Sequence, residues 1–183
     1  MILLDIAKSF FYGKVCLSGV AVDFTMGRGH DTLFLSSLVP EGKVYAFDIQ
    51  KSALESTRKL LEENKVSNVE LILDSHANAG NYIKESVNFA MFNLGYLPGG
   101  DKSVHTMTES TLRAVRTALS LLAPAGILTI SVYPGHSEGK SEGDALEKEL
   151  CEIDKQKFSI LQCKMLNSPT SPYIIAIERN SKV

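Results

Sequence analysis

The sequence predicts an α/β protein with a mostly parallel seven-stranded sheet, a C-terminal antiparallel hairpin and helices on both faces of the sheet. Apolar runs rich in β-forming residues alternate with helical patterns, which is typical of a parallel sheet covered on both faces. Two glycines follow the first strong run, and the last two runs are joined by a linker too short for a crossover helix. With 183 residues, 44% of them hydrophobic, the chain is expected to fold as one domain, 1–183.

Five strands are expected before the hairpin, and each reads as a continuous apolar stretch. They are residues 20–24, 43–47, 69–73, 87–92 and 127–132. Helical patterns fill the intervals between them, at residues 31–38, 52–63, 77–83 and 108–122. Ser52, with Glu55 three residues later, is expected to cap the second of these helices.

Two further strands, 158–166 and 173–178, are expected at the end of the chain. Residues 167–172, which contain two prolines, leave no room for a helix between them. The two strands must therefore pair as a hairpin, and one of them runs antiparallel to the rest of the sheet.

The composition excludes several classes of protein. The formal net charge is −2, so a nucleic-acid partner would need a local basic patch. No apolar run reaches the roughly 18–20 residues of a membrane span, and the start of the chain lacks the pattern of a signal peptide. A cytoplasmic protein with no membrane contact is therefore expected. The three cysteines and four histidines lack the spacing of a disulfide framework or a metal site, so no metal is expected.

The carboxyl ends of the first strands carry the features of a nucleoside-cofactor site. In an open parallel sheet, ligands bind beyond these strand ends. Gly27 and Gly29 follow the first strand and let the backbone turn close to a ligand. Asp48 ends the second strand, where a carboxylate can accept hydrogen bonds from the two hydroxyls of a ribose.

The acids around this loop favour S-adenosylmethionine over a dinucleotide. Thr32 stands where a dinucleotide fingerprint has its third small residue, and Asp31 would lie beside a pyrophosphate. S-adenosylmethionine carries a sulfonium cation and no phosphate, so Asp23 and Asp31 suit it. The parallel sheet with its terminal hairpin resembles the class I methyltransferase fold, which implies that Asp74 faces the adenine. The expected cofactor-binding residues are Asp23, Thr25, Gly27, Gly29, His30, Asp31, Thr32, Asp48, Gln50, Asp74, Ser75, His76 and Asn93.

The segment Asn93–Lys102 after the fourth strand is expected to bind the methyl acceptor. It is similar to the Asn/Asp-Pro-Pro-Tyr/Phe motif of amino-methylating enzymes, except that Leu94 and Gly95 replace the prolines. The carbonyl of Asn93 could hold an amine with its lone pair directed at the methyl group, and such positioning supplies most of the rate in an in-line transfer. Asn93 and Tyr96 are the expected catalytic residues.

Further candidates for substrate binding lie near the same edge. The segment 133–140 follows the fifth strand, and all four histidines lie past strand ends or in adjoining loops. A surface turn remains the alternative for this segment. The expected substrate-binding residues are Leu94, Gly95, Tyr96, Lys102, His105, Tyr133, His136 and Lys140.

Three segments, Asp23–Thr32, Phe92–Lys102 and Tyr133–Lys140, together resemble one known family. On these segments the chain is similar to bacterial tRNA 5-aminomethyl-2-thiouridine methyltransferases, small Rossmann-like class I proteins formerly labelled rRNA methylases. The resemblance implies methylation of the aminomethyl nitrogen of 5-aminomethyl-(2-thio)uridine at the wobble position, with the tRNA anticodon stem-loop as partner. We hypothesise that Asn93 and Tyr96 bind the modified base and that His136 and Lys140 close over it.

Three other functions remain open. The acceptor could be rRNA, or a small molecule methylated by the same fold. A catalytically silent subunit that binds S-adenosylmethionine is the alternative that is not an enzyme. A homodimer is also open.

Overall fold

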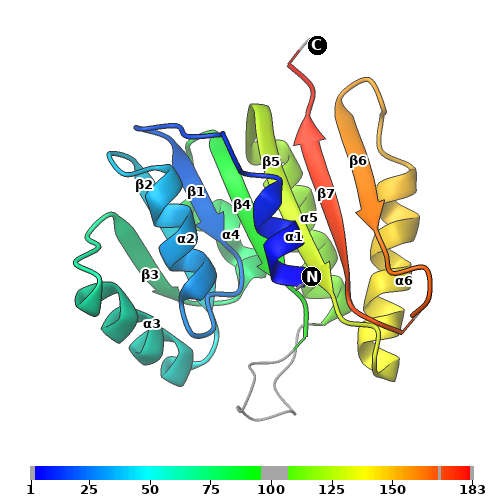
Figure 1. Cartoon of the computed structure of the whole chain (residues 1–183), viewed down its shortest axis with the longest axis horizontal. Coiled ribbons are helices and arrows are strands. Elements are labelled where there is room, and N and C mark those ends of the chain that lie inside the picture. Colours follow the sequence, from blue (N-terminus) through cyan, green and yellow to red (C-terminus); the bar gives the residue numbers. More distant parts are fainter. Residues whose placement is uncertain (1–2, 96–106, 169, 182–183) are drawn as a thin grey trace.

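The computed structural model describes residues 3–95, 107–168 and 170–181. Seven strands form one sheet in the order β3-β2-β1-β4-β5-β7-β6 (Figure 1). Their bounds are β1 Val20–Asp23, β2 Lys43–Asp48, β3 Val69–Leu73, β4 Val87–Asn93, β5 Leu122–Val132, β6 Phe158–Cys163 and β7 Tyr173–Arg179. The first five strands pair in parallel, and β7 is antiparallel to both β5 and β6. The predicted mostly parallel sheet with a terminal hairpin is confirmed.

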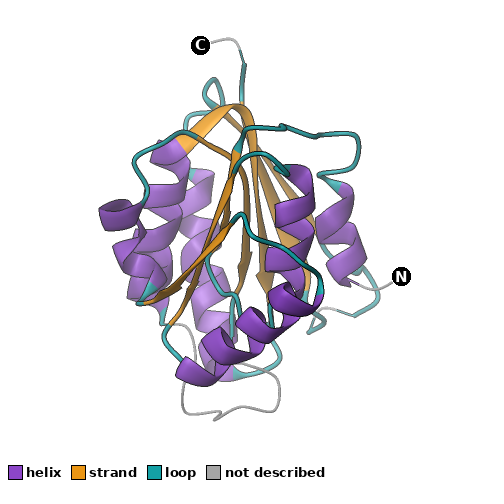
Figure 2. Ribbon diagram, turned by 90° about the vertical axis from the view of Figure 1, so that its left-hand side faces the viewer, coloured by secondary structure: helices purple, strands orange, loops and turns teal. Residues whose placement is uncertain are grey.

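Helices cover both faces of this sheet (Figure 2). They are α1 Leu3–Ser9, α2 His30–Leu38, α3 Lys51–Glu63, the 3-10 helix η1 His76–Asn78, α4 Ala79–Tyr82, α5 Thr108–Leu121 and α6 Ser137–Cys151. α1 and α2 bury apolar side chains on one face of the sheet, for example Phe11, just after α1, and Leu35. α4, α5 and α6 pack on the other face, where Leu146 is fully buried. The sheet therefore has two hydrophobic layers, as its continuous apolar strands predicted.

Two helices were not expected from the sequence. α1 has seven residues and lies at the amino end of the described chain. α6 covers residues 137–151, part of which was interpreted as a loop, and its N-cap is His136. Both are stabilised mainly by packing on the sheet, because Ala7 and Leu146 have no exposed surface.

Two predicted boundaries were wrong. α3 begins at Lys51, and its N-cap is Gln50 in an extended conformation, so Ser52 does not cap the helix. The carbonyl of Gln50 accepts from the amides of Ala53 and Leu54, which starts the helix earlier. β5 begins at Leu122, not at residue 127, because Leu122 already pairs with Val87, and residues 123–126 form an irregularity within the strand.

β6 is also shorter than predicted. It ends at Cys163, and Met165 and Leu166 lie beyond it as exposed side chains.

The parallel strands all end at the same edge of the sheet, the lower edge in Figure 1. This edge therefore gathers the polar residues that follow β1, β2, β3, β4 and β5.

Candidate active site

The loop between β1 and α2 is held between the two neighbouring strands. The amide of Phe24 donates to the carbonyl of Met91 (3.0 Å), and the amide of Met26 donates to the carbonyl of Phe47 (2.8 Å). Gly29, with φ +84°, ends the loop, and a Cβ there would lie 2.8 Å from Cγ2 and 3.0 Å from Cα of Thr57. Glycine is therefore required at Gly29 both by its backbone conformation and by the close approach of α3.

Asp23 lies buried at the end of β1. One carboxylate oxygen accepts from the amide of Thr25 (3.1 Å) and the other from the hydroxyl of Thr32 (2.6 Å). Burial, followed by the negative charge of Asp31, raises the pKa of Asp23 to about 7. A cation bound beside these two carboxylates would relieve their repulsion.

Asp48 joins the end of β2 to the glycine loop. Its oxygens accept from the amides of Gly27 (3.1 Å) and Gln50 (2.9 Å), and burial raises its pKa. Ile49, the next residue, is 55% exposed although it is apolar. Ile49 was not among the cofactor-binding residues predicted from the sequence, where its one signal is its place directly after Asp48.

The residues after β3 are engaged with one another. The carboxylate of Asp74 accepts from the amide of Ser75 (2.7 Å), the side chain of Asn78 (3.0 Å) and the hydroxyl of Tyr82 (2.8 Å), and these donors lower its pKa. The hydroxyl of Ser75 accepts from the amide of Ala77 and caps η1. Both ends of this short turn are thus fixed by side chains.

His76, the first residue of η1, packs against the end of β4. Its ring lies edge-on to Phe92 with a centroid distance of 4.8 Å, and Nε2 is 3.3 Å from the hydroxyl of Ser110. Burial lowers the pKa of His76 to about 4, although a hydrogen bond to the backbone of Phe24 opposes this shift. His76 is therefore a neutral packing group at neutral pH.

Asn93 ends β4 and connects three elements. Its amide donates to the hydroxyl of Thr25 (2.8 Å), and its side-chain Nδ2 donates to Oδ2 of Asp31 (2.8 Å). Oδ1 of Asp31 forms an ion pair with Lys8 of α1 at 2.9 Å. Within the described part of the chain, the buried Oδ1 of Asn93 has no hydrogen-bond partner. Lys8 was not predicted as a site residue, because nothing in its local sequence links it to a site whose nearest predicted residue, Asp23, is 15 positions later.

Of the three predicted substrate residues after β5, Tyr133 interacts with Asp31, whereas His136 and Lys140 belong to the start of α6. Tyr133 is half-buried, and burial together with the charge of Asp31 raises its pKa, so its hydroxyl lies in the field of that acid. His136 caps α6, since its Nδ1 accepts from the amide of Gly139 (2.9 Å). Lys140 is exposed in the first turn of α6. Tyr133 is therefore linked to the acids through the charge of Asp31.

The remaining predicted substrate residues divide into two groups. Leu94 is 3% exposed and packs in the core, so only its backbone could contact a ligand, and Gly95 adopts φ +122°. Tyr96, Lys102 and His105 lie outside the described residues.

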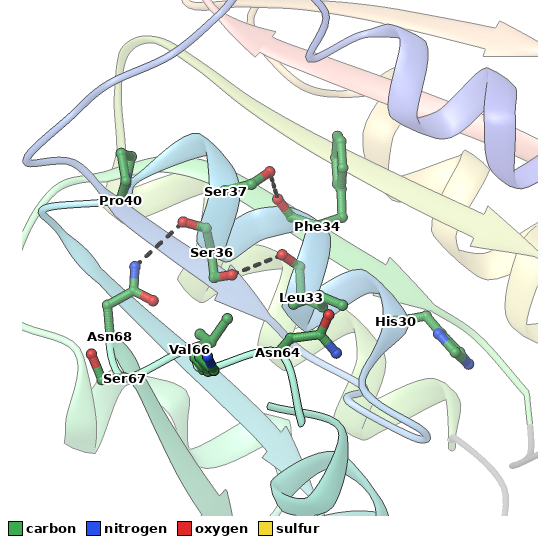
Figure 3. A pocket seen from close by; sticks show the side chains of 11 residues that line it. His30, Leu33, Phe34, Ser36, Ser37, Pro40, Asn64, Val66, Ser67 and Asn68 are labelled. Atoms are coloured by element: carbon green, nitrogen blue, oxygen red, sulfur yellow. Dashed lines mark hydrogen bonds between the residues drawn. The ribbon is translucent and has the colours of Figure 1, made fainter. Parts of the chain in front are cut away.

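His30 faces a different surface. It lies at one end of a groove of about 600 Å³ between α2 and residues 64–68 (Figure 3). The next residue, Asp31, instead contacts Asn93. The groove contains none of the other expected cofactor-binding residues.

Neither a metal site nor a membrane-spanning helix is found within the described ranges. No group of three or more His, Cys, Asp or Glu side chains there could hold a metal ion. None of the helices in the described chain is long and apolar enough to cross a membrane.

The chain is similar in sequence to known RNA methylases. The family model described as "Putative rRNA methylase" matches residues 44–178. The chloroplastic tRNA (mnm(5)s(2)U34)-methyltransferase of Arabidopsis thaliana is 36% identical over 166 residues, which cover 84% of this chain and 61% of that relative. The chain therefore spans about three-fifths of the length of the Arabidopsis protein.

Solved structures are similar over nearly the whole chain. A structure described as a "putative rRNA-methylase" from Clostridium thermocellum has a TM-score of 0.94 at 36% identity, covering 98% of each chain. A "putative methyltransferase" from Streptococcus mutans in complex with SAH has a TM-score of 0.90 at 39% identity, again covering 98% of each chain. These likenesses confirm the Rossmann-like class I methyltransferase fold.

Proposed function

The chain belongs to the family described as "Putative rRNA methylase", and from this premise we propose that it is a tRNA-modifying enzyme dependent on S-adenosylmethionine. It methylates the aminomethyl nitrogen of 5-aminomethyl-(2-thio)uridine at the wobble position. It acts in the cytoplasm as a single-domain enzyme, and the anticodon stem-loop is its RNA partner. The Arabidopsis relative, whose name specifies this nucleoside, supports the choice of acceptor.

The residues at the sheet edge fit S-adenosylmethionine. When bound, the cofactor supplies an electrophilic methyl group on a sulfonium cation. Asp48 is placed to accept hydrogen bonds from ribose hydroxyls, and the exposed apolar face of Ile49 suits an adenine ring. The nearby carboxylates of Asp23 and Asp31 favour a positive charge. Gly27 and Gly29 let the backbone approach closely.

The buried carbonyl oxygen of Asn93, which has no hydrogen-bond partner among the residues that the structure describes, is the observation that carries the proposal. A buried acceptor without a partner gains free energy when a donor reaches it, because its desolvation is otherwise uncompensated. An amine that donates one N–H to this oxygen keeps its lone pair free to attack a methyl group. The backbone amide of Asn93 donates to the hydroxyl of Thr25, which holds the backbone of Asn93 beside the cofactor loop.

The aromatic ring of Tyr133 is the described group best placed to stack on the splayed uracil. Tyr96 supplies a second ring in this proposal, and Lys140 and His136 contact the RNA from the start of α6. Recognition of an unstacked loop base by stacking and edge hydrogen bonds is the usual route to sequence specificity in RNA.

The test uses purified protein, S-adenosylmethionine and two RNA substrates. The first is tRNA that carries the unmethylated aminomethyl uridine. The second is rRNA that lacks its own modifications, taken from the same cells as the tRNA. We expect methyl transfer to the tRNA, with the product nucleoside identified by mass spectrometry. Labelling of rRNA alone would instead select the rRNA function, and labelling of neither would reject both.

A variant pair assigns the reaction to the site. Asn93→Ala should lose methyl transfer while still binding S-adenosylhomocysteine. Asn64→Ala is the matched control, because Asn64 lies at the exposed end of α3, where its side-chain amide donates to the carbonyl of Leu60. Undiminished transfer by Asn93→Ala would contradict the assignment.

A further inference from the structure

Lys8, Asp31 and Asn93 form a continuous chain of polar contacts from α1 to the end of β4. Lys8 Nζ lies 2.9 Å from one oxygen of Asp31, and Nδ2 of Asn93 lies 2.8 Å from the other. The side chains of Lys8 and Asp31 are only 23% and 11% exposed. The contacts are thus largely shielded from water. Ion pairs and hydrogen bonds are stronger in such an environment of low dielectric constant.

This chain determines which way the amide of Asn93 faces. An ionised carboxylate only accepts hydrogen bonds, so the amide must turn its NH₂ toward Asp31. The amide is planar, and its oxygen therefore faces away from Asp31. That oxygen is the buried acceptor that has no partner within the described residues.

We propose that Asp31, held by Lys8, is a positioning residue that keeps the carbonyl oxygen of Asn93 toward the acceptor amine. This inference rests on the proposed function. If the amide were reversed, its NH₂ would donate to the lone pair of the amine, which is the electron pair that must attack the methyl group. The reversed amide would therefore bind the amine in an unreactive state.

Lys8 has a second role in this arrangement. A carboxylate without a cation beside the acceptor would stabilise the ammonium form of the amine, which has no lone pair to donate. Among the described residues, Asp31 contacts Asn93, which is neutral, and interacts with Asp23 and Tyr133, which are not cations. Lys8 pairs with Asp31 at 2.9 Å, and its charge offsets that of the carboxylate.

The kinetic test compares Asp31→Asn and Lys8→Met with the unmodified protein. Asp31→Asn can offer an NH₂ to the oxygen of Asn93 and so reverse the amide. We expect kcat to fall on the order of 10²-fold, the scale of a misplaced reacting group, with a much smaller rise in the KM for S-adenosylmethionine from the loss of a carboxylate near the sulfonium. Lys8→Met should lower kcat less and shift the pH profile of kcat toward alkaline pH, and Lys8→Arg should restore both.

A lysine outside the site provides the control. Lys51 also pairs with a carboxylate, that of Glu55 at 3.7 Å, but on the exposed surface of α3. Lys51→Met should leave kcat and its pH profile unchanged. If Asp31→Asn instead raises the KM for the cofactor at constant kcat, Asp31 binds the cofactor and the positioning role is overturned.

A readout independent of turnover separates this inference from the proposed function. In ¹⁵N-labelled protein, the side-chain amide signals of Asn93, assigned by their loss in Asn93→Ala, should move when Asp31 or Lys8 is replaced. Unmoved signals in folded Asp31→Asn would overturn the orientation of the amide. If Asp31→Asn does not fold, Lys8→Met decides by the same signals and by its pH profile. Moved signals in a protein that methylates no amine would keep the contact chain but reject the proposed function, and with it the positioning role.

Discussion

The hydroxyl of Thr32 donates a 2.6 Å hydrogen bond to the carboxylate of Asp23, and neither residue has any exposed surface. The bond joins the first turn of α2 to the end of β1. Asp23 is thereby fixed beside the glycine loop, although burial raises its pKa to about 7. The hydroxyl of Thr32 and the amide of Thr25 both donate to this carboxylate, and these two bonds partly oppose the rise in its pKa.

Thr32→Val should destabilise the fold by removing that donor without changing the shape of the side chain. Loss of a hydrogen bond to a buried carboxyl costs about 1–3 kcal/mol in the free energy of unfolding. Urea denaturation at pH 7 measures this. Thr117→Val is the matched control, since the Thr117 hydroxyl donates to the carbonyl of Arg113 on the exposed side of α5. Its replacement should cost less than about 0.5 kcal/mol. Equal losses in the two variants would show that the bond to Asp23 contributes nothing specific.

The stability of the protein should depend on the protonation of Asp23. Its pKa is raised from 3.8 to about 7, so the folded protein binds this proton more tightly than the unfolded chain does. The contribution of Asp23 to stability is therefore fully present below pH 4 and is lost as the pH rises to about 7. Asp23→Asn cannot titrate, so the difference in unfolding free energy between the two proteins should change across this range. Parallel stability curves for the two proteins between pH 4 and pH 8 would contradict this assignment.

Gly29→Ala should be more damaging than Gly13→Ala. Both glycines have positive φ, +84° and +76°, so alanine costs roughly 1–2 kcal/mol at either position. A Cβ at Gly29 also meets the backbone of Thr57, whereas nothing lies within 4 Å of a Cβ at Gly13. Overpacking should add about 1–3 kcal/mol to the cost at Gly29. Thermal unfolding of the two variants separates the conformational cost from the steric one, and similar melting temperatures would rule out the steric part.

The strand part of the fold could be predicted from the sequence because buried parallel strands are continuous apolar runs. The helices were harder to predict when their stability comes from tertiary packing. α6 contains Gly139 and Gly143, which are poor helix formers. A Cβ added at Gly143 would lie only 2.7 Å from the Tyr173 hydroxyl, so glycine at this position lets α6 pack closely against β7. Local sequence favours a loop there, and only the packed neighbour explains the helix.

The candidate site could be predicted where it depends on strand ends. Asp23, Asp48 and Asn93 were identified because parallel strands end at one edge of a sheet. Lys8 could not be identified, since its contact with Asp31 depends on where α1 packs. The buried state of His76 and the capping role of His136 likewise follow from contacts between distant elements.

Asp48 offers the most direct test of the cofactor site. We propose that its carboxylate binds the ribose, but it also accepts from the amides of Gly27 and Gln50, so its removal could act on the cofactor or on the loop. Asp48→Ala should weaken binding of S-adenosylmethionine by about 1.5–3 kcal/mol, the scale of lost hydrogen bonds to a charged group. Asp48→Asn keeps one oxygen for the loop but loses the charge and one acceptor, so its affinity should lie between those of the alanine variant and the unmodified protein. Calorimetry measures both affinities, and circular dichroism confirms folding. Unchanged affinity in a folded alanine variant would exclude Asp48 from the ribose site, whereas equal losses in both variants would assign the effect to the carboxylate charge.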